Sequence, residues 1–266
     1  MKFSIVVPSF NQAQFVAESV ESILSQQGDF EIECLVFDGG STDGTVEVLK
    51  SIEAKLAAGQ YNANKERPTL FWVSQKDKGQ SDAINQGLKK ATGDICAYLN
   101  SDDYYPAGCF QLVANKFQAE PKKIWLTGRC QIVDQNGQPI RSLIAGYKNF
   151  WLDHYSYRKL LVLNFVSQPA TFWRQTAVKE FGYFRVDLNY VMDYEYWLRI
   201  ARGNDPIVVQ ETVSNFRIHQ SSKGQTRARA QFAEDLAVSS HYSSSRFLNL
   251  LHSWHNQLIL LVYRFI

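Results

Sequence analysis

The stretch Ile95-Cys96-Ala97-Tyr98-Leu99-Asn100-Ser101-Asp102-Asp103 decides how this chain is interpreted. Its first five residues form an apolar run, which predicts a buried strand. Its last four residues are polar or acidic, and adjacent carboxylates at the end of a buried strand are unfavourable without a positive group nearby. A divalent cation with oxygen ligands is one such group. The alternative is a capping pair before a helix that starts near Pro106.

The residues around this stretch alternate between strand and helix patterns. Further strands are predicted at 3–7, 33–37 and 70–73, and helical spacing at 17–26, 45–56 and 81–91, with a polar loop at 57–67. This alternation predicts an α/β fold whose mainly parallel central sheet is flanked by helices.

Polar residues follow each predicted strand. In parallel sheets ligands bind beyond the carboxyl ends of the strands. Turns and helix caps also explain such residues at any single end. Four ends in a row favour a binding site, and they carry Pro8-Ser9-Phe10-Asn11, Asp38-Gly39-Gly40-Ser41-Thr42-Asp43, Gln75-Lys76-Asp77-Lys78-Gly79 and Asn100-Ser101-Asp102-Asp103.

Asp38 is followed by Gly39-Gly40, which permits close approach of a ligand to the backbone. Its carboxylate could accept a hydrogen bond from a ribose hydroxyl or a base N–H. The stretch matches neither a phosphate-binding P-loop nor a dinucleotide fingerprint. Asp43 and Ser81 are interpreted as N-caps of the helices that follow them.

The remaining charged candidates are ambiguous on composition alone. Lys78 could meet a phosphate or be solvated, and Asp82 suits the first turn of a helix on dipole grounds. Asp193 could be a general base or a cap. Asp193 and Glu195 are two residues apart, so only one is expected to face a given site.

The later region is less regular. Strands are predicted at 124–127, 131–133, 170–174, 207–209 and 213–218, a hairpin turn at Asn136-Gly137, and helices within 147–165 and 190–201. The aromatic segment Phe150–Tyr157 could stack on sugar rings, line a lipid path or pack in a core.

Composition bounds the class of protein. The chain has 266 residues, 45% hydrophobic, and a net charge of +2, which excludes a disordered chain and gives no reason to expect nucleic-acid binding. The four cysteines are expected to be reduced and buried in a cytoplasmic protein without a signal peptide. The apolar C-terminal stretch 247–266, flanked by Arg246 and Arg264, could lie on the inner face of a membrane, or pack on the domain or on a second subunit.

Four segments, in this order, resemble the family-2 glycosyltransferases of the GT-A fold: Ile5–Asn11, Val36–Thr45, Asp77–Gly87 and Leu99–Asp103. A weaker likeness continues through Gln168–Phe172, Asp193–Arg199 and Phe216–His219. The resemblance implies a donor-binding half over 1–105, an acceptor-binding and catalytic half over 106–220, and a helical extension over 221–266.

The resemblance also implies roles for individual residues. Asp193 would be the general base, and Asp102 the main ligand of Mn²⁺ or Mg²⁺, with Asp103 beside it and His219 helping to hold the metal or the diphosphate. The nucleotide would lie against Pro8, Ser9, Asp38, Asp77, Lys78, Gly79, Asp82 and Ser101, with Asp38 and Asp77 on the base, which is usually uracil.

Two residues depart from the family pattern. Asn100 replaces the first Asp of the metal motif, so an amide without charge stands there. Met192 stands where the family often has Glu before the base. The Gln-x-x-Arg-Trp motif of processive members is absent, which predicts transfer of one sugar per encounter.

The resulting hypothesis is an inverting, metal-dependent transfer from a nucleoside-diphosphate sugar, UDP-linked, to a sugar or lipid-linked sugar acceptor in cell-surface polysaccharide or glycolipid synthesis. One alternative is a nucleotide-sugar-binding module or partner subunit without activity, suggested by Asn100 and Met192. A metal-dependent nucleotidyltransferase is the other, and it would need more cationic residues near the site than Lys78 alone.

Overall fold

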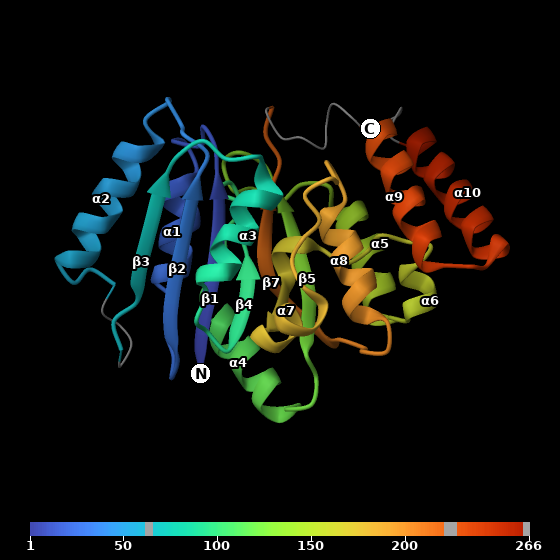
Figure 1. Ribbon diagram of the computed structural model, residues 1–266, viewed down its shortest axis with the longest axis horizontal. Helices are drawn as coiled ribbons and strands as arrows, with labels where there is room; N and C mark the ends of the chain where they lie inside the picture. The colour runs from blue at the N-terminus through green and yellow to red at the C-terminus, as the bar shows by residue number, and fades with distance from the viewer. Residues whose placement is uncertain (62–65, 221–227, 263–266) are drawn as a thin grey trace.

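The computed structural model describes residues 1–61, 66–220 and 228–262. One seven-stranded sheet, in the order β3-β2-β1-β4-β6-β5-β7, runs through the molecule with helices on both faces (Figure 1). The strands are β1 (Lys2–Ser9), β2 (Glu31–Asp38), β3 (Thr69–Ser74), β4 (Ile95–Tyr98), β5 (Trp125–Val133), β6 (Thr171–Arg174) and β7 (Ile207–Arg217).

The first half of the sheet is parallel, as the alternating pattern predicted. Strand β1 pairs with β2 and β4, and β2 pairs with β3, all in parallel. The intervening helices are α1 (Val16–Leu24), α2 (Thr45–Ala57) and α3 (Gln80–Lys90). Part of the loop predicted at 57–67 lies outside the described residues, and its first residue ends α2.

The strand register brings the polar segments together. Ser9 is opposite Asp38, and Asp38 is opposite Ser74. Beyond the strands, the backbone N–H of Gly39 donates to the Ser9 carbonyl at 2.9 Å, and that of Gln75 donates to the Asp38 carbonyl at 2.9 Å. The carboxyl ends of β1, β2 and β3 therefore form one continuous edge.

Helix α3 packs closely on the face of the sheet over β1 and β2. A Cβ atom at Gly87 would lie 2.3 Å from Cγ1 of Val6, a distance that no side chain tolerates. Glycine at this position lets α3 lie close to β1. The first residues of the helix then lie next to the strand ends.

The second half of the sheet departs from the predicted strands. Strand β6 runs antiparallel to both β4 and β5. The pairs of strands predicted at 124–127 with 131–133 and at 207–209 with 213–218 are two continuous strands, β5 and β7, which pair through register shifts at Gly128 to Cys130. The predicted turn at Asn136-Gly137 forms and closes a short hairpin, in which the backbone N–H of Asp134 donates to the Gln138 carbonyl at 2.8 Å, that of Ile140 donates to the Ile132 carbonyl at 2.9 Å, and Val133 bridges Pro139 in antiparallel.

Aromatic packing explains much of the ring content after residue 145. Trp125, Trp173 and Trp197 are fully buried, and the rings of Trp125 and Trp197 stack with centroids 6.1 Å apart. Within the segment 150–157 the rings divide: Phe150 is 55% exposed, and Trp151 packs against the core. All four cysteines are free and buried, as predicted.

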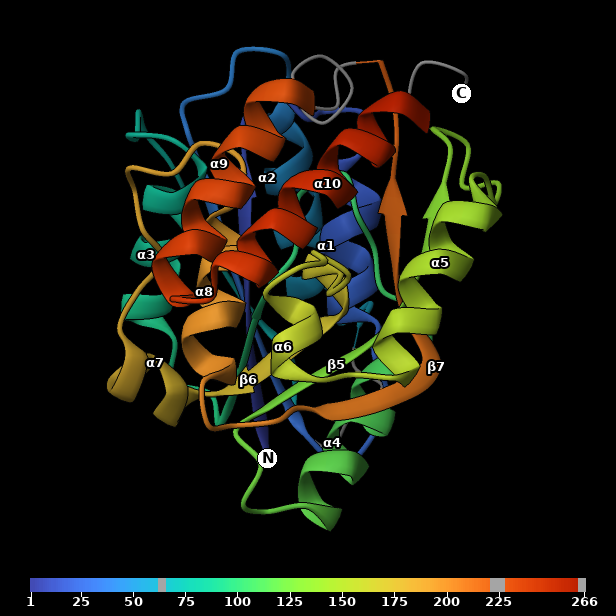
Figure 2. The same cartoon turned by 90° about the vertical axis from the view of Figure 1, so that its right-hand side faces the viewer.

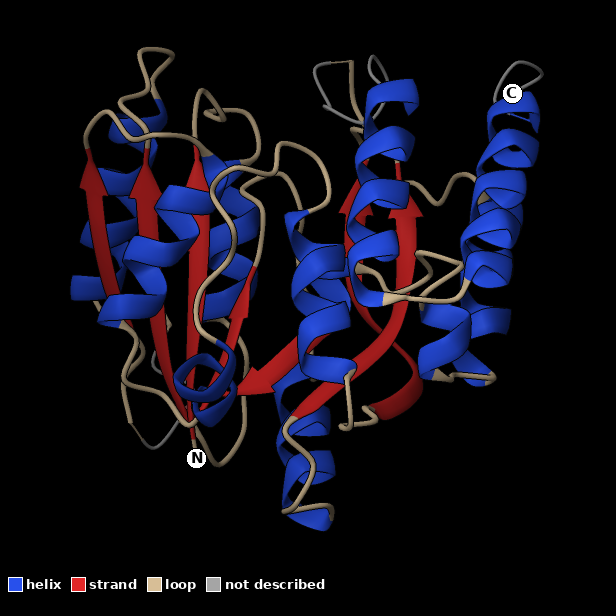
Figure 3. Ribbon diagram, turned by 45° about the vertical axis from the view of Figure 1, so that its right-hand side comes forward, coloured by secondary structure: helices blue, strands red, loops and turns tan. Residues whose placement is uncertain are grey.

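The remaining helices cover the second half of the sheet. They are α4 (Cys109–Ala119), α5 (Ser142–Asp153), α6 (Tyr157–Leu160), the 3₁₀ turn η1 (Gln168–Ala170), α7 (Gln175–Phe181), α8 (Met192–Ala201), α9 (Ala228–Tyr242) and α10 (Arg246–Val262). Figure 2 shows α9 and α10 side by side, with α8 next to α9. Figure 3 shows that these helices lie at the opposite side of the molecule from the parallel strands β1, β2 and β3.

Helix α10 has one side that the protein does not cover. Six large apolar side chains on it are exposed: Phe247, Leu250, Leu251, Trp254, Leu258 and Leu261. In the described ranges no helix has both the length and the apolar character needed to cross a bilayer. Arg264, predicted to flank this stretch, lies outside the described residues.

Candidate active site

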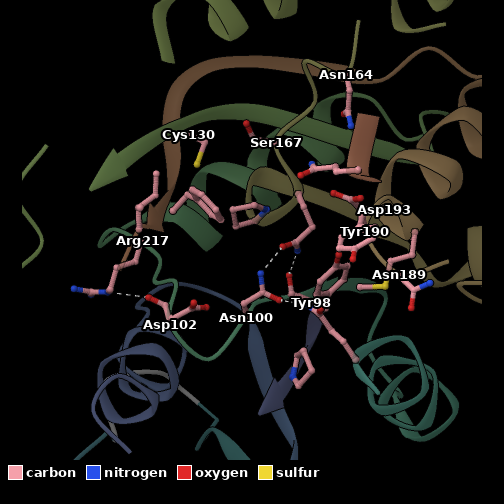
Figure 4. Close-up of a pocket in the computed structure, with 18 of the residues that line it drawn as sticks. Tyr98, Asn100, Asp102, Cys130, Asn164, Ser167, Asn189, Tyr190, Asp193 and Arg217 are labelled. Carbon is pink, nitrogen blue, oxygen red and sulfur yellow. Dashed lines mark hydrogen bonds between the residues drawn. The ribbon is translucent and has the colours of Figure 1, made fainter. Parts of the chain in front are cut away.

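A pocket of about 1010 Å³ lies at the carboxyl ends of β1 and β4. Its strand-end wall is formed by residues 8–12, 39, 76, 77, 79, 80, 83, 98 and 100–102, and its helical wall comes from α5, α8, α9 and α10. In Figure 4, Asp102 lies on the opposite side of the pocket from Asp193, with Asn100 and Tyr98 between them. The pocket therefore places the two predicted key carboxylates around one space.

Five predicted nucleotide residues line the strand-end wall: Pro8, Ser9, Asp77, Gly79 and Ser101. Near them, a Cβ atom at Gly39 would lie 3.0 Å from Oδ2 of Asp77 and 3.3 Å from Cδ2 of Phe10. Phe10 is 60% exposed and also lines the pocket. Glycine thus keeps open the space between an aromatic ring and a carboxylate.

Asp38 does not lie on the pocket wall. Its side chain is 2% exposed, and its Oδ2 accepts from the backbone N–H of Ser41 at 2.9 Å and from Oγ of Ser74 at 2.6 Å, while Oδ1 accepts from Oγ of Ser41 at 2.5 Å. With both oxygens so occupied, Asp38 shapes the loop that carries Gly39. The predicted direct contact of Asp38 with the base stays a prediction.

Lys78 and Asp82 are also absent from the pocket lining. Oδ2 of Asp82 accepts from the backbone N–H of Lys78 at 3.2 Å and from Nε2 of Gln86 at 3.0 Å. In this structure the contacts of Asp82 are local to the start of α3, and the nucleotide contacts of Lys78 and Asp82 stay predictions. Lys76, two residues earlier, lines the pocket instead.

The predicted helix caps also change. The carboxylate of Asp43 accepts from the backbone N–H groups of Ala13 at 2.9 Å and Thr45 at 3.1 Å, although Gly44 holds the cap position itself. Ser81 is not a cap, because α3 begins one residue before it; its Oγ instead contacts Sδ of Met192 at 2.5 Å and joins α3 to α8.

Asn100 is held in a relay of amides. Its Oδ1 accepts from Nε2 of Gln80 at 2.7 Å, and its Nδ2 donates to Oε1 of Gln168 at 3.3 Å. Gln168 in turn donates from Nε2 to the Tyr98 carbonyl at 2.7 Å. The amide that replaces a metal-motif carboxylate therefore ties the end of β4 to α3 and η1.

Asp103 points away from the pocket. It is fully buried, and its Oδ1 accepts from the backbone N–H of Arg217 at 2.8 Å. Burial, and then the nearby charge of Asp102, raise the pKa of Asp103 well above its usual range. Its predicted metal contact is replaced by a structural one. The capping alternative fails as well, because α4 begins at Cys109 and its cap position is Gly108.

Asp102 lines the pocket and is positioned by Arg217, whose Nε donates to the Asp102 carbonyl at 2.9 Å. Nε2 of His219 lies 3.0 Å from Oδ2 of Asp102, and the ring of Phe15 packs on that imidazole with centroids 4.7 Å apart. No group of three or more His, Cys, Asp or Glu residues suited to a metal occurs in the described ranges. A carboxylate and an imidazole fit an ion that takes its other ligands from substrate phosphates and water.

Asp193 is the second residue of α8 and faces the pocket. Burial raises its pKa to about 6, and the charge of Lys148 on α5 offsets part of that rise. Glu195 points elsewhere, as predicted, because its carboxylate pairs with Nη2 of Arg199 at 2.6 Å. Burial lowers the pKa of Lys148, whose charge interacts with both Asp193 and Asp235.

Sequence reasoning missed the residues that α5, α9 and α10 contribute to the pocket. They include Tyr147, Lys148, Asp235, His255 and Asn256. His255 and Asn256 were visible as interruptions of an apolar stretch, and such polar positions on an apolar helix were the available signal. Nothing in the local pattern around Lys148 or Asp235 distinguished them from solvated residues.

Comparisons with known proteins agree with this architecture. The fold is similar to that of Staphylococcus aureus TarS residues 1–349 in complex with UDP-GlcNAc, with a TM-score of 0.67 and 19% identity over 91% of this chain and 66% of that one. It is equally similar to the mannosyltransferase PcManGT of Pyrobaculum calidifontis in complex with GDP-Man and Mn²⁺, with a TM-score of 0.67 and 20% identity over 94% of this chain and 68% of that one. These likenesses define a GT-A fold.

Sequence comparison then gives the family. The model of glycosyl transferase family 2 matches residues 4–182, and the chain belongs to that family. An uncharacterized glycosyltransferase of Mycobacterium tuberculosis is 27% identical over 80% of this chain and 74% of its own length. Chondroitin synthase of Escherichia coli is 25% identical over 74% of this chain and 33% of its own length.

Proposed function

We propose that this chain transfers one sugar from a nucleoside-diphosphate sugar, UDP-linked, to an acceptor hydroxyl with inversion at the anomeric carbon. The observation that carries this proposal is the position of Asp193 across one pocket from Asp102 and the strand-end wall. A pocket of about 1010 Å³ is at the upper end of the usual range for ligand sites, with room for a donor and an acceptor sugar together.

The nucleotide base fits beside Gly39. The ring of Phe10 offers a stacking surface, and the carboxylate of Asp77 can accept from an N–H of the base edge. TarS was solved with UDP and UDP-GlcNAc, and PcManGT with GDP-Man. These neighbours differ in the base that they bind. For this chain we propose uracil, on the basis of the Asp77 carboxylate.

The diphosphate fits near Asp102. Asp102 and His219 would hold Mn²⁺ or Mg²⁺, which supplies positive charge against the leaving diphosphate. Asn100 contributes no charge, and its oxygen is engaged by Gln80. The protein therefore offers one carboxylate and one imidazole, and the phosphates themselves complete the donor set.

Transfer itself requires removal of one proton. The carboxylate of Asp193 takes the proton of the acceptor hydroxyl while that oxygen bonds to the anomeric carbon and the bond to the diphosphate oxygen breaks. Attack from the face opposite the leaving group inverts the configuration. Asp193 is suited to this step because its pKa of about 6 leaves it ionised at neutral pH yet a stronger base than an ordinary carboxylate.

Calorimetric titration of UDP, GDP and their sugar conjugates, with and without Mn²⁺, tests the donor site. We expect UDP to bind most tightly and only with the ion, and Asp102→Ala to abolish that dependence. Equal UDP binding with and without Mn²⁺ would argue against the metal site. Donor binding without transfer to any acceptor and without donor hydrolysis would favour the alternative of an inactive binding module.

The uncovered side of α10 adds a proposal about location. Its six exposed apolar residues include Trp254, and the helix has no acidic residue and starts at Arg246. Such a face suits the interface of an anionic membrane. His255 on the same helix lines the pocket, so this contact would bring the pocket close to a lipid-linked acceptor for polysaccharide or glycolipid synthesis.

A further inference from the structure

The helical wall of the pocket holds a carboxylate that the transfer step does not use. Asp235 on α9 lines the pocket although its side chain is only 3% exposed. Within the described residues its Oδ1 has no hydrogen-bond partner. Nε2 of His252 lies 3.6 Å from this oxygen, within ion-pair distance but beyond hydrogen-bond distance, and within the described residues it also has no hydrogen-bond partner. A buried carboxylate oxygen at a pocket wall without a donor is costly unless a ligand supplies one.

The neighbours of Asp235 are also polar and directed at the same space. His255 uses Nε2 to contact the Tyr147 hydroxyl at 2.8 Å, and its buried Nδ1 has no hydrogen-bond partner in the described ranges. Asn256 is 5% exposed and donates from Nδ2 to the Phe232 carbonyl at 3.2 Å. The wall therefore presents several hydrogen-bonding groups held in place by the protein.

The charges on this wall select the kind of ligand. Lys148 lines the same pocket as Asp193 and Asp235, so α5, α8 and α9 together contribute one cation and two carboxyl groups to this space. A phosphate or a uronic acid placed here would meet both carboxyl groups. Neighbouring hydroxyls of a sugar ring would instead donate to a carboxylate, which accepts two hydrogen bonds readily.

We propose that Asp235 is a specificity-determining residue that binds hydroxyls of an uncharged acceptor sugar, while Asp193 deprotonates another hydroxyl of the same sugar. This inference rests on the proposed transferase function and adds the acceptor class to it. It also gives α9, which lies outside the segment 4–182 matched by the family model, a direct place in the site.

Asp235→Asn tests the proposal, with Asp235→Ala as a second variant and Asp205→Asn as the matched control. Asp205 is exposed and lies in a loop outside the pocket lining. The probes are methyl glycosides of common neutral hexoses and of glucuronic acid, added to the UDP-loaded protein with Mn²⁺. Ligand-observed NMR measures their binding, and transfer from UDP-sugars gives KM and kcat for those that act as acceptors.

We expect a neutral methyl glycoside to bind, and Asp235→Asn and Asp235→Ala to weaken its binding or raise its KM at least tenfold. The affinity for UDP should stay within twofold of wild type, as it should in Asp205→Asn. Unchanged acceptor binding in both Asp235 variants would overturn the proposal, and so would preference for the glucuronide or failure of every neutral glycoside to bind. Failure of wild type to bind any nucleotide would instead refute the proposed function itself.

Discussion

At the scale of single residues, the pKa of Asp193 sets a prediction for pH. A general base must be ionised, so activity should be half-maximal near pH 6, rise to its full value at higher pH and fall as the pH drops below about 6. Asp193→Asn should lower kcat by about 10²–10⁴-fold and leave the affinity for UDP unchanged. Initial rates and UDP titrations measure both. Normal turnover in this variant would refute the assignment, and Asp187→Asn, an exposed carboxylate paired with Arg185, is the control.

Lys148 should tune that base. Burial is the main cause of the raised pKa of Asp193, and the Lys148 ammonium works against it. Lys148→Met removes the positive charge, so the pKa of Asp193 should rise and the acidic limb of the kcat/KM profile should move to higher pH. Lys148→Arg keeps the charge and should keep the wild-type limb. Identical profiles for Met and wild type would show that Lys148 does not act on Asp193.

Gly39 should matter through space alone. A Cβ atom there meets the Asp77 carboxylate at 3.0 Å and the Phe10 ring at 3.3 Å, so Gly39→Ala should close the space assigned to the base and weaken UDP binding about tenfold or more. Gly203→Ala is a demanding control, because Gly203 has a positive φ but open space around it and lies away from the pocket. Calorimetry on both variants separates lost space from lost stability.

Single residues also show where sequence reasoning stops. The pattern of strand ends placed Asp102 and Asp77 at the pocket, and the resemblance placed Asp193 there. The same reasoning also selected Asp38 and Asp103. Their carboxylates accept hydrogen bonds from backbone N–H groups and hydroxyls inside the protein. The end of a strand determines where a residue lies. Whether its carboxylate points to the ligand or to the core depends on the backbone conformation just after the strand, and the local sequence pattern does not determine that conformation.

At the scale of elements, the parallel half was predictable because each strand there is a short apolar run between helices of clear period. The other half was harder, because β5 and β7 contain bulged polar positions near Arg129 and Thr212 that resemble breaks. Bulges preserve pairing while disturbing the alternation of side chains. Two real strands therefore looked like four short ones.

Helix α10 carries the prediction that belongs to this scale. The protein should sediment with vesicles of phosphatidylglycerol and phosphatidylcholine, and Trp254→Ser should reduce the bound fraction several-fold, because a 68% exposed indole is an interfacial anchor. Gln257→Ser, also exposed on α10, should bind like wild type. Absence of vesicle binding, together with a wild-type dimer that Trp254→Ser converts to monomer by light scattering, would assign this face to a second subunit.

At the scale of the whole molecule, one pocket draws residues from Pro8 to Ile259. The strand-end wall is local in sequence and could be inferred, whereas the helical wall depends on how α9 and α10 return to the sheet. The packing of α9 and α10 depends on tertiary contacts, such as the 2.9 Å hydrogen bond between Nδ1 of His252 and the Leu161 carbonyl. No period or motif announces such a contact.

Glu234 links the position of α9 to catalysis, because it contacts the loop that precedes the base Asp193. Its carboxylate on α9 accepts from the backbone N–H groups of Asn189 at 2.9 Å, Tyr190 at 2.7 Å and Val191 at 3.1 Å. These donors precede α8, whose second residue is Asp193. Glu234 thus holds the loop that leads into the helix presenting the base, from a helix more than thirty residues away in sequence.

Glu234→Gln keeps the size of the side chain but replaces one accepting oxygen with an amide that cannot accept. At least one N–H should lose its partner, at a cost of about 1–3 kcal/mol in the free energy of unfolding measured with urea. Because the loop before Asp193 should then loosen, kcat should fall about tenfold or more while UDP affinity stays constant. Glu180→Gln, an exposed acid on α7, controls for charge. Loss of stability with an unchanged kcat would show that α9 supports the fold without positioning the base.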